Sequence, residues 1–272
     1  MGYSVEVESD TYNSEVVQAS YSKTVIVDFY ATWCGPCKLL KPILEKLVLE
    51  YDFILAKVDI DKNQDLATRY GIEGVPDVRV VVEGQMYPGF VGVMSEPQIR
   101  ALLTQLNLKS DLEIGLEAVR DAIAVQNPQQ AKQILDQLFA KYPHNPQIAL
   151  EAARFLIRFN RLDDAEKIVK TIGADQREFY PKAQAFQTLI ELQRGVNDLG
   201  DSELDRLFGQ AARLTLAEDY ENALPLFLQV VQSSRKYRDD GARKAMIAIF
   251  NLLGLSHPLT KQYQQELMLA LY

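Results

Sequence analysis

The sequence predicts two domains: an α/β fold over residues 1–108 and an all-helical fold over residues 109–272. Strand-like and helix-like patterns alternate through the first part, which is typical of a central mixed sheet flanked by helices. After residue 108 the strand signal disappears, and apolar residues recur at helical spacing to the end of the chain. A length of 272 residues also fits two domains of ordinary size.

The expected elements of the α/β part follow one another with short connections. Runs of β-branched and aromatic residues predict strands at 24–30, 53–58, 78–82 and 86–91. Apolar residues at helical spacing predict helices at 37–50, 65–70 and 95–106. Gly71 ends the second of these helices, Ser95 caps the third, and Glu83-Gly84 forms the turn between the last two strands.

A period of 34 residues runs through the helical part. Ala131 and Ala165 are 34 positions apart, and larger apolar residues repeat beside them. A third copy fits at Leu207, Ala211, Leu214, Ala223 and Phe227. We expect an inserted helix at about 178–193 before that copy, and two terminal helices at about 240–253 and 259–271. We favour a tetratricopeptide-like array, which presents a concave surface to protein segments; the alternative is an unrelated helical bundle with a chance period.

The overall composition excludes several classes of partner and location. A net charge of -8 without a basic block disfavours nucleic acid and anionic membranes as partners. No apolar run approaches the roughly 18–20 residues of a membrane span. The opening MGYSVEVESD lacks the basic and apolar regions of a signal peptide. Two cysteines are too few for a disulfide-stapled secreted protein, so we expect a cytoplasmic protein with a working cysteine pair.

That pair lies in the motif Trp33-Cys34-Gly35-Pro36-Cys37, directly after a predicted strand and at the start of a helix. Cys34 would lie at the helix N-terminus, where free N–H groups and the helix dipole stabilise a thiolate. Cys37 lies about one turn further along, within reach of a disulfide. Gly35 and Pro36 shape the turn, and proline in a first helical turn loses no needed N–H. The motif predicts thiol–disulfide exchange, with Cys34 attacking and Cys37 resolving.

A CxxC pair is also half of a zinc site. Zinc needs four ligands, and the two histidines, His144 and His257, both lie in the helical part. We therefore expect no metal and no cofactor besides the redox-active disulfide. The same scarcity of histidine disfavours a Cys–His protease.

Several stretches of the first domain resemble thioredoxin: VDFYATWCGPCK, the proline five residues after Cys37 (Pro42), AKVDID and GIEGVP. The resemblance covers residues 5–107, approximately. It implies that Asp28 is a buried acid with a raised pKa, which relays a proton from Cys37. The alternative is a core acid held only by pairing with Lys57.

The resemblance also implies a substrate groove beside the motif. Pro76 matches the proline that is cis in thioredoxins, and the backbone of Val75 would pair with an extended substrate segment. Trp33, Gly74 and Gly92 would line the same groove.

The sequence departs from the thioredoxin pattern directly after Pro76. Asp77 and Arg79 stand where thioredoxins usually carry threonine and apolar residues, and both lie on one face of the predicted strand. Either the helical domain covers this pair or the strand end is exposed.

The fusion of the two domains resembles the chaperedoxin family (CnoX/YbbN type), and the ending LTKQYQQEL with Ala270-Leu271-Tyr272 is similar to that family's terminal helix. The resemblance implies a redox-active co-chaperone that holds unfolded or oxidised client proteins and shields their cysteines through mixed disulfides. Such proteins pass clients to a GroEL-type chaperonin and a DnaK-type chaperone, and an external thiol reductant restores them.

In that family, chaperonin docking is attributed to the terminal region. The resemblance carries this role to Tyr263, Leu267, Leu271 and Tyr272, the first three of which share one helix face. The alternative is that the stripe caps the core of the last repeat.

A second function is also open: a thioredoxin-type protein disulfide reductase whose helical domain docks one dedicated partner. A scaffold with regulatory thiols is a third. A client-holding protein should display a large apolar surface, whereas a docking module should show a smaller, more charged groove.

Overall fold

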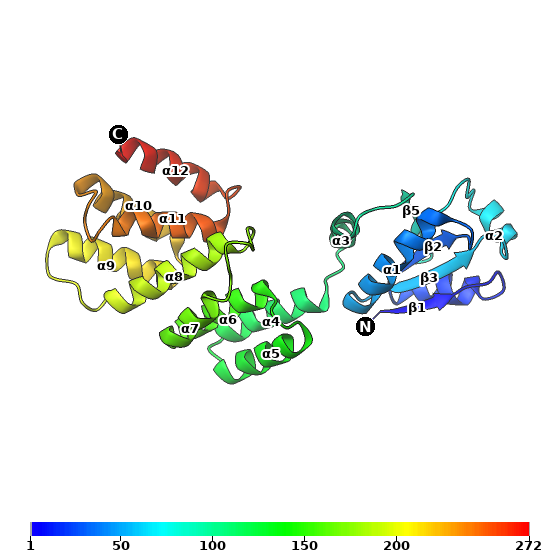
Figure 1. The fold of residues 1–272 in the computed structure, drawn as a ribbon, viewed down its shortest axis with the longest axis horizontal. Helices are drawn as coiled ribbons and strands as arrows, with labels where there is room; N and C mark the ends of the chain where they lie inside the picture. Colours follow the sequence, from blue (N-terminus) through cyan, green and yellow to red (C-terminus); the bar gives the residue numbers. More distant parts are fainter. Residues whose placement is uncertain (1, 272) are drawn as a thin grey trace. The chain divides into compact units, whose positions relative to one another are not determined.

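The computed structural model describes residues 2–271, which form two compact units, Met1–Ile114 and Gly115–Tyr272 (Figure 1). The division falls inside helix α4 (Asp111–Ala124), a few residues beyond the predicted boundary at residue 108. The boundary is later than predicted because residues after 107 still belong to the first unit: Leu108 packs into its core, and a β-bridge joins Tyr51 to Ser110.

The first unit contains a five-stranded mixed sheet with the strand order β1-β3-β2-β4-β5. The strands are β1 (Tyr3–Glu6), β2 (Val25–Tyr30), β3 (Ile54–Asp59), β4 (Asp77–Val82) and β5 (Gln85–Val91). Strands β1 and β2 run parallel to β3, while β4 is antiparallel to β2 and to β5. The four predicted strands are present. Strand β1 was not predicted, because it is a short edge strand whose residues are largely exposed and give little hydrophobic signal.

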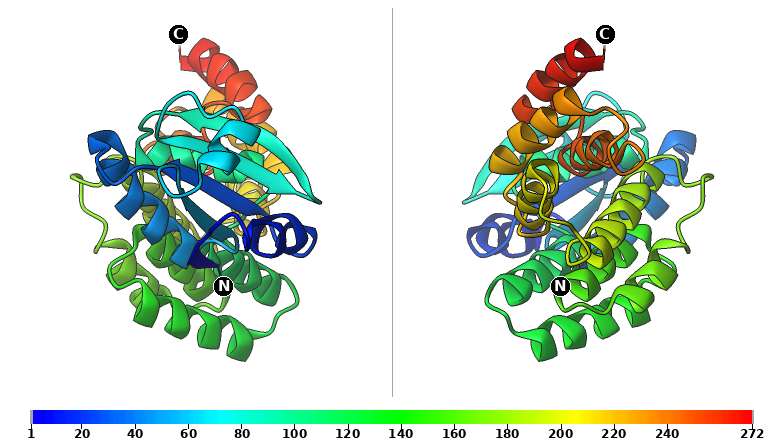
Figure 2. Two further views of the ribbon diagram at one scale, coloured as in Figure 1. Left: turned by 90° about the vertical axis from the view of Figure 1, so that its right-hand side faces the viewer. Right: turned by 90° about the vertical axis from the view of Figure 1, so that its left-hand side faces the viewer.

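Helices cover both faces of this sheet. They are α1 (Gly35–Glu50), α2 (Gln64–Arg69) and α3 (Glu96–Gln105), with a helical segment formed by η1 (Asn13–Gln18) and η2 (Ala19–Tyr21). Apolar side chains of α1 and α3 pack on one face, and those of η1 and α2 pack on the other. Figure 2 (left) shows α1 and the η1–η2 segment on opposite sides of the sheet.

Strand β2 contributes to both halves of this core because its side chains alternate between the faces. Val27 and Phe29 belong to the cluster under η1, whereas Ile26 belongs to the cluster under α1. Asp28 shares the face of Ile26 and therefore points to the side that α1 covers. The alternation explains how an apolar strand places one carboxylate in the sheet interior beneath the helix that carries the cysteines.

The second unit is all-helical over its described residues, as predicted. Its helices after α4 are α5 (Pro128–Lys141), α6 (Pro146–Arg158), α7 (Leu162–Val169), α8 (Tyr180–Gly195), α9 (Glu203–Leu216), α10 (Tyr220–Ser233), α11 (Gly241–Leu253) and α12 (Pro258–Leu271). The predicted inserted helix is α8, and the two predicted terminal helices are α11 and α12. Ala131, Ala165 and Ala223 are fully buried near the starts of α5, α7 and α10, where small side chains let helices approach closely. Figure 2 (right) shows these helices packed side by side.

The terminal helix bears on the predicted docking stripe. Tyr263 and Leu267 are only 9% and 6% exposed and belong to the core of the helical unit, and Leu271 packs against the same core. The burial of Tyr263 and Leu267 favours the alternative interpretation, in which the stripe caps the core, and docking of a chaperonin stays a prediction. Tyr272 lies outside the described residues.

None of the helices within residues 2–271 combines the length and the apolar character that crossing a bilayer requires.

Candidate functional site

The cysteine motif lies where β2 leads into α1. Cys34 is the N-cap residue of α1, and its sulfur is joined to that of Cys37 across a Cα–Cα distance of 5.3 Å. The backbone N–H of Cys37 points at Cys34 Sγ over 3.1 Å. Because this N–H is one of the free donors of the first helical turn, it would stabilise a thiolate on Cys34 after reduction. Gly35 and Pro36 form that turn, and a Cβ at Gly35 would meet nothing within 4 Å.

The loop before β4 brings a backbone carbonyl close to the sulfur of Cys34. Cys34 Sγ lies 3.6 Å from the carbonyl oxygen of Val75, and the Val75–Pro76 peptide bond is cis. The N–H of Gly92 donates to the carbonyl oxygen of Pro76 over 2.8 Å, and Gly92 has a φ of 86°. A Cβ at Gly74 would meet nothing within 4 Å, so the backbone there is open. The predicted groove residues Val75, Pro76 and Gly92 therefore meet at one place beside Cys34.

Trp33 stands at the surface next to the cysteine pair. Its side chain is 67% exposed, and its indole N–H donates to the Asp61 carboxylate over 2.9 Å. Sequence reasoning missed Asp61 as a site residue. The signal was available, because Asp61 ends the AKVDID stretch that resembles thioredoxin.

Asp28 is a buried carboxyl with a strongly perturbed pKa. Its side chain is 2% exposed, and within residues 2–271 no hydrogen-bond donor reaches its Oδ1. Burial raises the pKa of Asp28 to about 7, against an opposing attraction from Lys57. An acid with such a pKa can take up and release a proton near neutral pH.

Lys57 has other partners. It stands beside Asp28 in the register of β2 and β3, but its ammonium pairs with Glu6 at 2.9 Å and with Glu45 at 3.1 Å. Asp28 is therefore not held in the core by an ion pair with Lys57, which was the alternative to a proton-relay role.

Asp77 and Arg79 form a bidentate ion pair with one another. Arg79 Nε lies 2.5 Å from Asp77 Oδ1, and the second guanidinium contact to Oδ2 measures 2.7 Å. Asp77 is buried, and its bidentate partner is partly exposed. The pair neutralises itself at the start of β4, immediately after Pro76. Among the described residues, no group of three or more His, Cys, Asp or Glu side chains is arranged to hold a metal ion.

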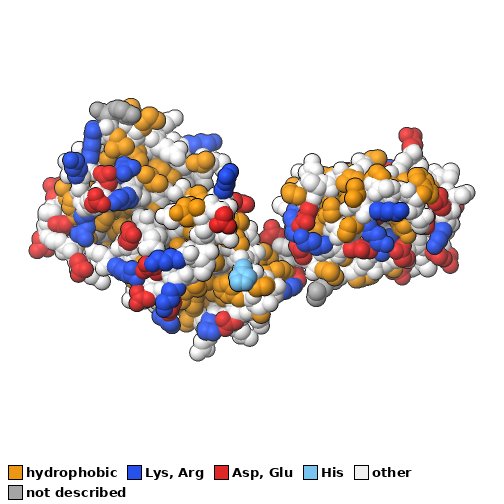
Figure 3. Space-filling model, viewed as in Figure 1, with side chains coloured by type: hydrophobic (Ala, Val, Ile, Leu, Met, Phe, Trp, Pro, Cys, Tyr) orange, Lys and Arg blue, Asp and Glu red, His pale blue; other side chains and the backbone are white. Residues whose placement is uncertain are grey.

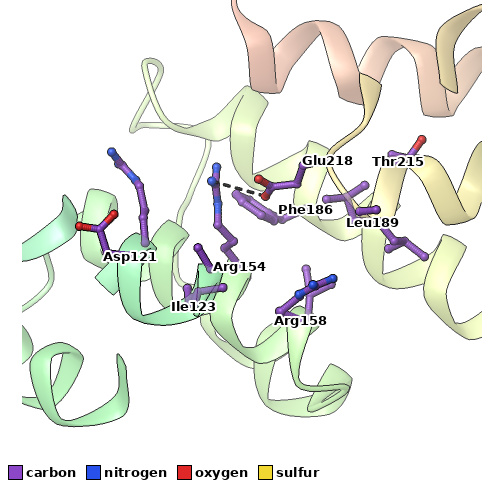
Figure 4. Close-up of a pocket in the computed structure, with 13 residues that line it drawn as sticks. Asp121, Ile123, Arg154, Arg158, Phe186, Leu189, Thr215 and Glu218 are labelled. Carbon is purple, nitrogen blue, oxygen red and sulfur yellow. Dashed lines mark ion pairs between the residues drawn. The ribbon is translucent and has the colours of Figure 1, made fainter. Parts of the chain in front are cut away.

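Two of the hollows in the helical unit differ in chemistry. The first, here called the arginine pocket, has a volume of about 360 Å³ (Figure 4). Its main lining residues are Arg120, Arg154, Arg158, Phe186, Leu189 and Glu218.

Two of its arginines have acidic partners. Arg120 pairs with the buried Glu151 at 2.9 Å, and Arg154 pairs with Glu218 across the pocket at 3.4 Å. Arg158 makes no ion pair with any residue of the described chain.

The second hollow, here called the apolar trough, lies between α5, α6 and α7 and has a volume of about 630 Å³. Its apolar lining residues include Leu135, Phe139, Phe155, Leu156, Phe159 and Ile168. A client-binding or docking surface in this unit was expected from the sequence, but no residue of either hollow could be named from it.

Comparison with known proteins agrees with this division of the chain. The thioredoxin family model matches residues 3–105, and two tetratricopeptide-repeat models match residues 122–190 and 182–272. Thioredoxin from Acidithiobacillus ferridurans is 39% identical over 99 residues, which are 36% of this chain and 90% of that protein. Mitochondrial thioredoxin from Mus musculus is 46% identical over 84 residues, which are 30% of this chain and 51% of that protein. The chain thus spans about half the length of the mitochondrial relatives.

Among solved structures, a mutant thioredoxin from Halobacterium salinarum NRC-1 is 35% identical, with a TM-score of 0.35. The match covers 38% of this chain and 89% of that one.

Proposed function

The chain belongs to the thioredoxin family, and we propose that it exchanges disulfides with protein substrates through Cys34 and Cys37. One observation carries the proposal: Cys34 Sγ lies at the N-terminus of α1, 3.6 Å from the backbone oxygen of Val75. The helix end favours the thiolate, and the neighbouring backbone can align an extended substrate segment.

The exchange proceeds in two steps. The Cys34 thiolate attacks one sulfur of a substrate disulfide, so that a mixed disulfide forms and the other substrate sulfur leaves as a thiolate. Cys37 then attacks Cys34, which releases the second substrate thiolate and leaves Cys34 and Cys37 oxidised. Asp28 accepts the proton of Cys37 in this step. The substrate gains two electrons, and an external thiol reductant must return two to the cysteine pair.

We further propose that the chain is a redox-active co-chaperone of the cytoplasm. Its helical unit would hold unfolding or oxidised clients while the cysteines form mixed disulfides with them. The apolar trough supports this part of the proposal, because a holding surface needs exposed apolar lining. The resemblance to chaperedoxins supports transfer of clients to GroEL-type and DnaK-type chaperones.

A second candidate is a disulfide reductase whose helical unit docks one dedicated partner. The arginine pocket favours it, since Arg158 has no acidic partner among the described residues and lies beside apolar lining, which suits one specific acidic segment better than many unfolded chains.

Two assays test these proposals. Reduction of insulin disulfides, followed as turbidity with dithiothreitol as the reductant, tests the exchange. Light scattering from a denatured, cysteine-free client tests holding, with the intact protein and a Cys34→Ser/Cys37→Ser double variant compared side by side. If the double variant suppresses aggregation, holding needs no redox chemistry and the co-chaperone proposal gains support. If neither protein suppresses aggregation, the dedicated-partner reductase is favoured.

A further inference from the structure

The apolar trough has a wall of aromatic rings that disulfide exchange does not use. Phe155 of α6 and Phe159, the residue that caps the C-terminal end of this helix, have ring centroids 5.0 Å from one another. Phe139 of α5 and Ile168 of α7 also line the trough, and all four side chains are only half-buried. Figure 3 shows hydrophobic side chains reaching the surface over the α4–α7 part of this unit. The helices therefore leave apolar surface uncovered instead of packing it away.

The charged groups on the rim of the trough are already paired. Lys132 lies 2.6 Å from Asp136 on α5. Asp164 at the start of α7 pairs with Arg161 and, at 3.3 Å, with Lys167. Because each charge on the rim has an opposite partner in the chain, a charged ligand would gain little there. An uncharged apolar segment would still gain from leaving water.

A neighbouring hollow extends the apolar trough. Phe139 and Ile168 also line a neighbouring hollow of about 350 Å³, which continues past Pro143 to Ile172. Two hollows that share a wall suit a length of polypeptide better than a compact small molecule.

We propose that the apolar trough binds uncharged segments of non-native polypeptide that are rich in aliphatic and aromatic side chains. This inference rests on the proposed client-holding function and assigns it to α5, α6 and α7. The arginine pocket has the opposite chemistry, with Arg158 free of any ion pair among the described residues.

The test uses the full chain and two probes. The first is reduced, carboxymethylated α-lactalbumin, which stays unfolded and has no free thiol. The second is a fluorescently labelled short peptide built of Leu, Phe, Ala and Ser, compared with a version in which glutamates replace the serines. We expect Phe159→Asp to weaken binding of the uncharged peptide about tenfold or more, because a carboxylate in the trough must be desolvated. The glutamate peptide should bind the unmodified chain more weakly.

A matched control is available in the same unit. Leu255 is 75% exposed between α11 and α12, outside the trough, so Leu255→Asp adds the same charge without affecting the trough. It should bind both probes like the unmodified chain. Phe139→Ser changes the facing wall without adding a charge and should also weaken binding, which guards against a folding defect peculiar to one variant. Circular dichroism establishes that each variant is folded, and insulin reduction should be unchanged in all three.

The outcomes separate this inference from the function on which it rests. If the unmodified chain binds α-lactalbumin, and folded Phe159→Asp and Phe139→Ser bind it equally well, the protein does hold clients, but the assignment of this binding to the apolar trough is wrong. If the unmodified chain binds neither probe, client holding and the trough both fail, while insulin reduction still reports on the redox proposal. Tighter binding of the glutamate peptide, or self-association in sedimentation that Phe159→Asp abolishes, would also overturn the assignment.

Discussion

The sulfur of Cys34 lies 3.6 Å from the carbonyl oxygen of Val75, although 41 positions separate the two residues in the sequence. The first residue caps helix α1, and the second lies in the loop that precedes β4. Antiparallel pairing of β2 with β4 brings these two chain segments together. The sulfur that we propose as the nucleophile therefore lies directly beside an open backbone segment, where an extended substrate chain could pair.

The first prediction separates the roles of the two cysteines. Cys34→Ser should reduce insulin reduction to the rate of the reductant alone, because the attacking thiolate is lost. Cys37→Ser should still attack but cannot resolve, so mixed disulfides with substrate should accumulate on non-reducing gels. Turnover that survives in Cys34→Ser would show that the nucleophile is misassigned.

The second prediction concerns stability and pH. The pKa of Asp28 is raised to about 7 in the folded protein, against about 4 for an unfolded aspartate. Below pH 4 both states are protonated and the burial costs nothing. As pH rises from about 4 to 7 the unfolded state loses its proton first, so the free energy of unfolding falls, and the full penalty applies above pH 7.

Asp28→Asn should therefore stabilise the first unit above pH 7, by at most about 4 kcal/mol, and should have little effect near pH 4. Urea unfolding followed through Trp33, the single tryptophan, reports on this unit. A stabilisation that is equal at both pH values would contradict the assigned pKa.

The third prediction concerns the proton-relay role of Asp28. If Asp28 accepts the proton of Cys37, Asp28→Asn should slow the decay of a preformed mixed disulfide at least about tenfold near pH 7. Rapid-quench analysis of a labelled mixed disulfide measures this step directly. Raising the pH should restore the rate, because Cys37 then ionises without help. A variant that resolves at the normal rate at pH 7 would leave Asp28 a structural residue.

The fourth prediction concerns the ion pair between the buried Asp77 and the partly exposed Arg79. Arg79→Met should lower the free energy of unfolding of the first unit by about 2–3 kcal/mol, because Asp77 is left buried and unpaired. Trp33 fluorescence in urea again provides the measurement. Replacing both residues by valine should recover most of the loss, since the strand then has no uncompensated charge. If the double variant did not regain the lost free energy of unfolding, the ion pair would have a role in stability beyond neutralising the buried carboxylate.

The fifth prediction distinguishes the two faces of α12. Leu267→Ala should destabilise the helical unit by about 3 kcal/mol, because the side chain is buried in its core. Leu269→Ala, at a position that is 80% exposed, should change stability by less than about 0.5 kcal/mol. Thermal unfolding by circular dichroism compares the two variants. The Trp33 transition should be the same in both, and a Leu267→Ala chain as stable as Leu269→Ala would refute the core-cap role.

Features that depend on neighbouring residues could be predicted from the sequence alone. Four strands, the helices between them and the position of the cysteine motif at the start of α1 follow from propensity, periodicity and helix-end chemistry, which are local. The repeat of Ala131 at Ala165 likewise indicated a repeated helix pair, and both residues are fully buried near the start of a helix. The edge strand β1 escaped prediction because its residues are mostly exposed and its pairing with β3 is not local.

Which side chains are buried, and against which partners, was decided only by the tertiary structure. Asp28, Asp77 and Tyr263 could be singled out from the sequence, but their surroundings could not be predicted. Only the structure shows that Lys57 pairs with residues other than Asp28, that Arg79 neutralises Asp77, and that Tyr263 belongs to a core. Each of these outcomes depends on strand register or helix packing, and these determine the solvent exposure and the charged neighbours of a group. The sequence by itself determined the chemistry that the two cysteines can perform. The fold decided what surrounds them, because burial and pairing arise only when distant segments meet.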